Sequence, residues 1–145
     1  MTEGQASAIV DRLVHALNDH DLDGMLSCIS ASYVNDTPAH PERGFVGRDQ
    51  VGSNWAQIFA GVPDVHAVVT RIAVDHETVW SEWEITGTRT DCTPLLMRGV
   101  VIFRTAGNTI AAATFYLEPV EHLTGGAEHA VQRVVRGTPN LKEHP

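Results

Sequence analysis

Apolar residues recur along this chain with two different periods. In the first part they return every three or four positions, which is the spacing of a helix with one apolar face. This spacing predicts a helix over residues 5–18, a short second helix capped by Asp21, and a third that begins near Arg48 or Asp49 and stops at residues 61–64. The apolar positions that define these helices are Ile9, Val10, Leu13, Val14 and Leu17, then Leu22, Met25, Leu26 and Ile29, then Val51, Trp55, Ile58 and Phe59.

From residue 65 onward the pattern becomes that of strands. β-Branched and aromatic residues fill the segments 65–74, 78–88, 95–105 and 109–118. Because only short breaks separate these segments, they are expected to pair as an antiparallel meander. A shorter strand is expected at Ser32–Asn35, before a loop over residues 37–47 that holds two prolines and two glycines.

The last part of the chain is expected to add one helix and a tail. Residues 126–136 carry Ala127, Ala130, Val131 and Val134 at helical spacing, and residues 138–145 are expected to be a flexible tail. With helices first and long strands after them, the fold class is α+β. We expect a cone-shaped α+β barrel, a single domain over residues 1–137, whose strongly curved antiparallel sheet wraps around the N-terminal helices and encloses a conical hollow.

Composition narrows the classes of partner. The chain has 145 residues, of which 43% are hydrophobic, and a net charge of −8, which argues against binding nucleic acid or an anionic membrane through a positive field. No apolar run is long enough for a membrane span, and residues 1–5 lack the features of a signal peptide. Cys28 and Cys92 fit no paired metal motif and are expected to be free thiols, so we expect a cytoplasmic protein.

Four short motifs, taken in their order, carry a resemblance to a known superfamily. They are residues 9–18 with 21–24, residues 47–51 (Gly-Arg-Asp-Gln-Val), residues 61–64 (Gly-Val-Pro-Asp) and residues 115–121 (Phe-Tyr-Leu-Glu-Pro-Val-Glu). Over residues 5–120 the chain resembles the nuclear-transport-factor-two-like superfamily, in particular its ketosteroid isomerases, SnoaL-like cyclases and limonene epoxide hydrolases. Since this fold hosts several chemistries, each family's catalytic positions are compared separately.

The resemblance to ketosteroid isomerases does not extend to their catalytic residues. That family uses a tyrosine in the first helix, an aspartate base after the first strand and a protonated aspartate in a later strand. The matching positions here are Leu13, Thr37 and Gly99, with Asp36 immediately before Thr37. Steroid isomerisation by that route is therefore not expected.

The two other families match in part. Tyr33-Val34-Asn35 resembles the pair that holds the attacking water in limonene epoxide hydrolase, but its arginine and two aspartates correspond to Trp83, Ile85 and Phe115. SnoaL-like cyclases use an aspartate near the last strand. Phe115 stands there, and Glu118 is the nearest carboxylate.

Four polar residues are the candidates for chemistry. Asp36 is expected to act as the catalytic base, because a carboxylate at the mouth of an apolar hollow suits proton transfer; alternatively it caps the turn that follows. His40 is a second catalytic candidate, or a solvated loop histidine. Tyr33 and Asn35 share one strand face and are expected to position a ligand, or to form a structural hydrogen bond.

Large apolar side chains are expected to line the hollow, although the same residues would suit a plain core. They are Trp55, Phe59, Trp83, Met97 and Phe115. Glu82 and Glu84 alternate with Trp83 and are expected to face outward, with Arg98 as a cross-strand partner. The histidines show no metal-ligand spacing, so neither a metal nor a cofactor is expected.

These observations favour a cofactor-independent acid–base enzyme of the cyclase, isomerase or epoxide hydrolase type. Its substrate would be a hydrophobic molecule of the polyketide, terpenoid or steroid-like kind. The alternative is a non-catalytic small-molecule-binding or dimerisation module, and a more remote one is a subunit of a larger oxygenase. A homodimer through the outer sheet face around Trp80 is expected by analogy with the superfamily, with no nucleic acid and no membrane as partner.

Overall fold

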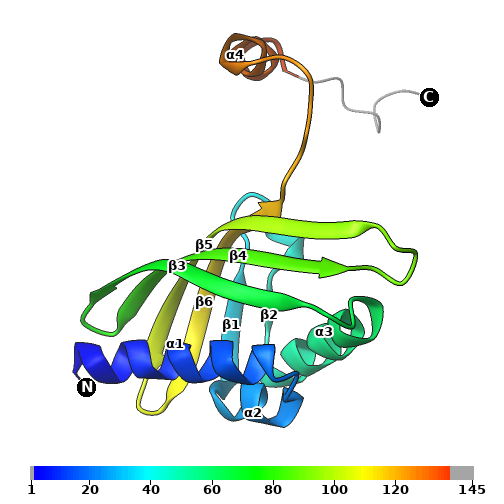
Figure 1. Cartoon of the computed structure of the whole chain (residues 1–145). Helices are drawn as coiled ribbons and strands as arrows, with labels where there is room; N and C mark the ends of the chain where they lie inside the picture. The colour runs from blue at the N-terminus through cyan, green and yellow to red at the C-terminus, as the bar shows by residue number, and fades with distance from the viewer. Residues whose placement is uncertain (1, 138–145) are drawn as a thin grey trace.

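The computed structural model describes residues 2–137, and three of its helices lie against a curved sheet (Figure 1). The helices are α1 (Glu3–Asn18), α2 (Leu22–Ser27) and α3 (Arg48–Gly61), and a fourth, α4 (Ala127–Arg136), stands apart from them beyond the last strand. The strands are β1 (Ile29–Asp36), β2 (Phe45–Val46), β3 (His66–Asp75), β4 (Thr78–Thr88), β5 (Pro94–Ala106) and β6 (Thr109–Pro119). This arrangement confirms the predicted α+β class.

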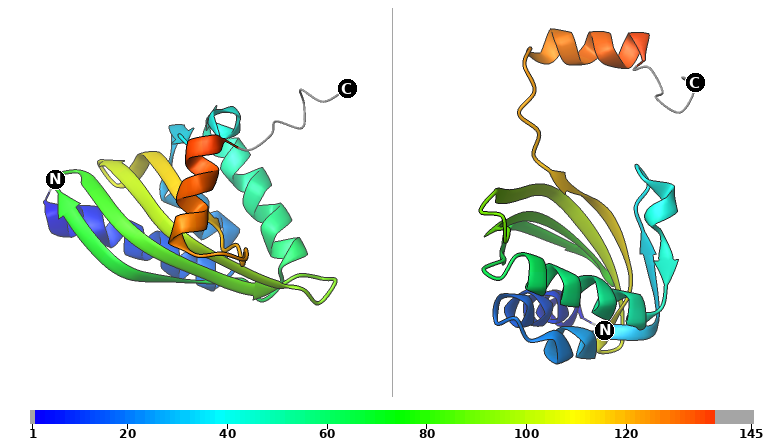
Figure 2. Two further views of the ribbon diagram at one scale, coloured as in Figure 1. Left: turned by 90° about the horizontal axis from the view of Figure 1, so that it is seen from above. Right: turned by 90° about the vertical axis from the view of Figure 1, so that its right-hand side faces the viewer.

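The six strands form one sheet in the order β2-β1-β6-β5-β4-β3. The long strands β3 to β6 pair antiparallel in sequence order, which confirms the predicted meander. β1 is the exception, because it pairs parallel to β6 while β2 pairs antiparallel to its other side. Seen from the side, the strands curve around the helices, and β1 and β2 stand opposite β4 and β5 (Figure 2).

The first two helices begin where their sequence provides a cap. Thr2 and Gln5 form a reciprocal capping box at the start of α1, and the Asp21 carboxylate accepts from the Gly24 backbone N–H at 3.0 Å in α2. The apolar stripe of α1 is buried against the sheet through Ala6, Ile9, Val10, Leu13, Ala16 and Leu17.

Two predicted boundaries were wrong. α2 ends at Ser27, so Ile29 is the first residue of β1 and not part of a helix, and β1 is longer than the predicted Ser32–Asn35. The segment 37–47 is not loop throughout: it contains a 3-10 turn at Pro41–Arg43 and the two-residue strand β2. In both cases a pairing across the sheet decides the structure, since Ile29 pairs with Ile110 and Val46 pairs with Val34.

The outer face of the sheet carries the charged pairs. Arg98 Nε donates to Glu84 Oε2 at 3.0 Å, as the sequence predicted, and Arg71 on β3 pairs with Glu82. These residues alternate along β4 with Trp83, whose ring is buried on the opposite face. The alternation therefore places the charged pairs on the outer face of β4 and Trp83 on its inner face.

Two predictions concern the ends of the chain and the extent of the domain. The predicted tail, residues 138–145, lies outside the described residues, and the assignment of residues 1–137 to one domain stays a prediction. Over residues 2–137, none of the helices combines the length and the apolar content needed to cross a bilayer.

Candidate functional site

Inner-facing residues of β4, β5 and β6 form rows across the sheet, and their burial changes along the strands. At one end, Phe103 pairs with Ala113, and these residues are 3% and 1% exposed. Toward the other end, Phe115, Leu117 and Met97 are only half-buried although they face inward. The Phe103 end of the cone is thus packed. At its other, wide end the apolar side chains of β5 and β6 are partly exposed, while Trp83 and Ile85 of β4, in the same rows, are only 4% and 5% exposed.

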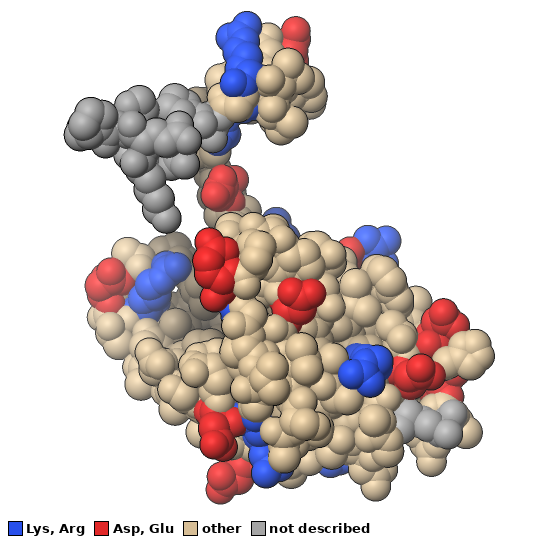
Figure 3. Space-filling view, turned by 180° about the vertical axis from the view of Figure 1, so that it is seen from behind, with Lys and Arg blue, Asp and Glu red and all other residues tan. Residues whose placement is uncertain are grey.

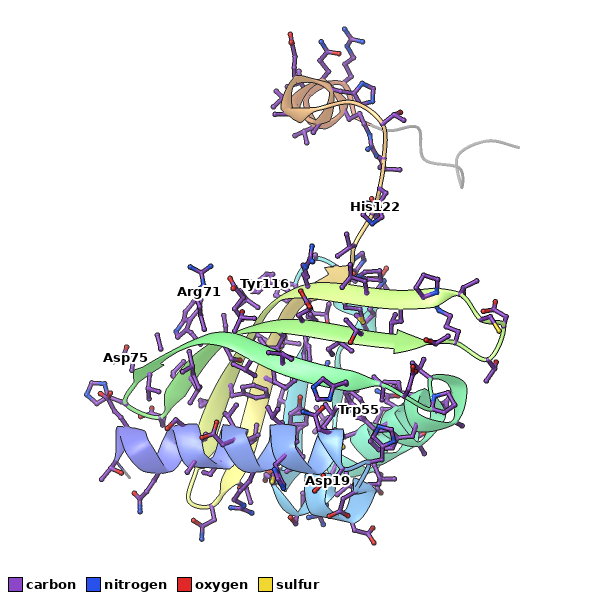
Figure 4. All side chains as sticks on the ribbon, viewed as in Figure 1. Asp19, Trp55, Arg71, Asp75, Tyr116 and His122 are labelled. Carbon is purple, nitrogen blue, oxygen red and sulfur yellow. The ribbon has the colours of Figure 1, made fainter. Side chains whose placement is uncertain are left out.

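The wide end is hollowed. From behind, the space-filling surface shows a recess below the segment that leads to α4, with acidic and basic side chains beside it (Figure 3). Trp55 extends from α3 beneath the strands, while Arg71 and Tyr116 stand on the outer side of the sheet (Figure 4). Trp55 and Phe59 lie on one side of α3 with their ring centroids 5.7 Å apart, and both are half-buried. Phe59 also stacks on His20, with ring centroids 4.8 Å apart. That both residues line the hollow stays a prediction.

Tyr33 and Asn35 are brought together as the sequence predicted. Both lie on one face of β1, and the Tyr33 hydroxyl donates to Asn35 Oδ1 at 2.8 Å. Tyr33 is 4% exposed, and burial raises its pKa well above the ordinary value because a phenolate would lose its hydration there. Asn35 is half-buried, and its Nδ2 has no hydrogen-bond partner within residues 2–137. An oriented amide donor therefore stands at the apolar wall.

Trp83 is held rigidly in that wall. Its Nε1–H donates to Ser81 Oγ at 2.8 Å, and Ser81 in turn donates to the Val101 carbonyl at 2.7 Å. The indole lies beside Phe103, with ring centroids 6.2 Å apart, and is 4% exposed. Trp83 is thus buried, whereas Phe115 and Met97, in the neighbouring rows on β6 and β5, are half-buried.

His40 contacts a carboxylate. Its Nε2 lies 3.1 Å from Glu118 Oε1 at the end of β6, and the guanidinium of Arg43 lies 3.5 Å from the same oxygen. The side chains of His40 and Glu118 are 42% and 36% exposed, so this cluster is at the surface. An imidazole whose one nitrogen bonds to a carboxylate has its other nitrogen free to accept a proton.

Asp36 follows Asn35 and projects to the other face of β1. It is exposed, its Cα partner is Thr114, and it makes no hydrogen bond or ion pair within residues 2–137. The structure therefore brings His40 to Glu118 and not to Asp36. The inner positions of β4, β5 and β6 hold no Asp, Glu or His, and Glu118 lies in the row of Arg98 and Glu84 near the end of β6.

Gly99 lies at the position that corresponds to the protonated aspartate of ketosteroid isomerases, and its backbone explains why no acid is found there. The residue lies between Trp83 and Leu117 in the inner rows, with φ +153°, and a Cβ there would stand 2.0 Å from the Tyr116 carbonyl oxygen. No residue with a side chain fits this backbone. Leu13 and Thr37, at the other two positions, are buried at 7% and 6% exposure.

Three contributors to the site were not predicted as site residues. They are Glu118 and Arg43, which hold His40, and Ser81, which holds Trp83. The period-two alternation of β4 does place Ser81 on the face of Trp83. The two rim residues come from segments far apart in the chain, and no local pattern joins them.

A separate polar groove lies between α1 and α2. It is lined among others by Asp11, Arg12, His15 and Asp19, and His15 Nε2 stands 3.3 Å from Asp19 Oδ2 in full contact with solvent. Within residues 2–137, no three His, Cys, Asp or Glu side chains gather as metal ligands would.

Comparisons with known proteins agree with this architecture. The family model for the SnoaL-like domain matches residues 10–113. A search of curated protein sequences finds no match to the chain.

Solved structures with the same fold include three that cover most of the chain. A presumed SnoaL-like polyketide cyclase from Jannaschia sp. CCS1 is 18% identical with a TM-score of 0.69, covering 94% of this chain and 95% of that one. A presumed ketosteroid isomerase from Kribbella flavida is 19% identical with a TM-score of 0.67, covering 96% and 93%. An LEH-like epoxide hydrolase from M. tuberculosis is 15% identical with a TM-score of 0.70, covering 80% and 84%. At such identities these structures establish the fold alone.

Proposed function

Because the chain belongs to the SnoaL-like domain family, we propose that it is a cofactor-independent acid–base enzyme acting on a hydrophobic small molecule. The substrate class is a polyketide-, terpenoid- or steroid-like compound, and the reaction is of the cyclase, isomerase or epoxide hydrolase type. One observation carries the proposal: a hydrogen-bonded polar pair, Tyr33 and Asn35, stands among mostly apolar inner-facing residues. Apolar side chains bind a ligand without fixing its orientation, and the polar pair fixes that orientation through hydrogen bonds.

Binding depends on the open end of the cone. Phe115, Met97 and Trp55 offer half-buried apolar surface to a flat ligand. The Asn35 amide N–H donates to a carbonyl, hydroxyl or epoxide oxygen of that ligand. Since Tyr33 holds Asn35 Oδ1, the amide cannot turn its acceptor toward the ligand without losing a hydrogen bond.

His40 is the proton acceptor in this proposal. With Nε2–H directed at Glu118, the Nδ1 lone pair accepts a proton from a carbon next to a carbonyl, or from a water. The negative charge that develops on the ligand oxygen is stabilised by the Asn35 amide. Asp36, the base predicted from the sequence, is the second candidate, since it follows Asn35 directly but lies on the opposite strand face.

A panel of epoxides and β-keto polyketide substrates tests the proposal. His40→Gln should lower kcat by about 10²- to 10⁴-fold if His40 transfers the proton, and Glu118→Gln should lower it less, because Glu118 only orients the ring. Glu42→Gln is the matched control, because Glu42 is exposed in the same segment and makes no hydrogen bond or ion pair with His40 within residues 2–137. Full activity of His40→Gln together with loss in Asp36→Asn would assign the role to Asp36.

A second outcome would show that the protein binds these compounds but does not catalyse a reaction. If panel compounds bind with an affinity that Asn35→Ala lowers, and no variant or wild-type protein turns any of them over, the chain is a binding module. The absence of an acid at the inner positions of β4, β5 and β6 is the observation behind this alternative.

We also propose a homodimer formed through the outer sheet face. Trp80 and Tyr116 are 50% and 48% exposed there, flanked by the Arg98–Glu84 pair. Exposed aromatic rings beside charged pairs are typical of protein interfaces. Sedimentation of wild type and Trp80→Glu tests this, and a monomeric wild type at micromolar concentration contradicts it.

A further inference from the structure

α4 carries an apolar face that no other part of the described chain covers. Ala127, Ala130, Val131 and Val134 follow one another at helical spacing, and Val131 and Val134 remain 60% and 82% exposed. Isolated helices shorter than about 12–15 residues are marginal in water, and valine disfavours the helix further. A helix of 10 residues therefore needs a surface on which to pack.

The open end of the hollow offers a surface with matching properties. Leu95, Met97 and Leu117 are half-buried apolar residues at that end. Val120 N–H donates to the Leu96 carbonyl at 2.9 Å, which fixes the start of the connecting segment at the rim. In the front, side and top views, α4 lies beyond the end of β6 and above the side on which β1 and β2 stand away from β5 (Figures 1 and 2).

The connecting segment allows α4 to reach this surface. Residues 121–126 span at most about 20 Å when extended, and a helix of this length is about 15 Å long. Gly125 adopts φ +94°, and a Cβ there would stand 2.7 Å from the Cβ of His129. Two successive glycines, Gly125 and Gly126, therefore join the segment to α4 as a natural pivot.

The distribution of charge also favours packing of α4 on the body of its own chain. Residues 1–120 hold seven arginines, no lysine and fifteen Asp or Glu. α4 carries Arg133 and Arg136 in its last turn against Glu128 in its first. A net positive helix approaching an acidic body is attracted to it, whereas an acidic body repels an anionic membrane. The short tether also gives α4 a far higher effective concentration at its own body than at a second copy.

We propose that α4 is a lid that packs its apolar face on the open end of the hollow of its own chain. Closure covers Leu95, Met97 and Leu117 and separates a bound ligand from solvent. The inference rests on the proposed function only in taking the hollow as the ligand site. Docking of α4 is measured without ligand, so a failure of either claim leaves the other one open to its own test.

Hydrogen exchange of the full-length chain tests the docking. Amides of residues 130–136 should exchange at least tenfold more slowly in the wild type than in Val134→Asp, because an aspartate cannot enter an apolar contact. Val134 is 82% exposed in the open position, so the substitution does not disturb the body. Gln132→Asp adds the same residue to the polar side of the same helix and should keep the wild-type exchange rate.

Contacts between methyl groups identify the surface. Nuclear Overhauser effects from Val134 to Leu95 or Leu117 should appear within one chain in a mixture of isotope-labelled and unlabelled protein. Three results overturn the proposal: exchange in the wild type as fast as in Val134→Asp, Overhauser effects that arise between two chains, and protection that appears only when anionic lipid vesicles are added.

Discussion

The Tyr33 hydroxyl donates to Asn35 Oδ1 at 2.8 Å, joining two side chains that leave β1 on the same face. The phenol is enclosed in the core, while the amide reaches the half-buried wall. The buried Tyr33 hydroxyl thereby fixes the orientation of the more accessible Asn35 amide. This arrangement has a consequence for the pH dependence of stability.

The stability of the protein should fall at alkaline pH because of Tyr33. Burial raises its pKa, so the folded protein keeps a proton that the unfolded chain loses above about pH 10. The unfolded state is then favoured by up to about 1.4 kcal/mol per pH unit. Urea unfolding at pH 9 and pH 11 should show a smaller loss in Tyr33→Phe than in the wild type. Equal losses in the two proteins would contradict the assignment.

Ser81→Ala should destabilise the fold by about 1–3 kcal/mol, because it leaves the buried Nε1–H of Trp83 without its acceptor and removes the hydroxyl bond to the Val101 carbonyl. The free energy of unfolding from a urea titration measures the loss. Ser32→Ala, at an exposed position of β1, is the control and should change stability by less than about 0.5 kcal/mol.

Gly99→Ala should cost about 3 kcal/mol or more, since a Cβ would stand 2.0 Å from the Tyr116 carbonyl oxygen and the backbone would have to move. Gly107→Ala is the matched control. Gly107 also has a positive φ, +59°, but nothing lies within 4 Å of its added Cβ. It should cost only about 1–2 kcal/mol from the left-handed conformation itself. Thermal unfolding separates the two, and similar midpoints would show that the contact at Gly99 relaxes freely.

Asn18→Ala should loosen the edge of the sheet. The Asn18 amide donates to the Ala67 carbonyl and accepts from the Ala67 N–H, both at 2.8 Å, so it replaces a neighbouring strand for β3. Without it the Ala67 amide should exchange with solvent at least tenfold faster. Asn54→Ala on α3 removes a surface amide bonded only to Gln50 and should leave that rate unchanged.

Local periodicity predicted most of the fold because the elements concerned are amphipathic by themselves. The start of α3 at Arg48 and the strands β3 to β6 follow from spacing alone. The start of β1 did not, since Ser30 and Ala31 carry no strand signal and Ile29 becomes extended only by pairing with Ile110. For the site, Tyr33 and Asn35 were predictable, being two positions apart on a strand. The contact of His40 with Glu118 was not, because the tertiary fold alone joins them.

The parallel pairing of β1 with β6 has a consequence for how the protein is made. β1 ends at Asp36, and the strand that it must join begins only at Thr109. A ribosome therefore releases β1 with one edge unsatisfied and must synthesise the entire meander before that edge is covered. Until then the nascent chain exposes a template for association with other chains. A protein cut short before Thr109 would keep Tyr33 and Asn35 in its sequence but would lack the strand that holds them in place.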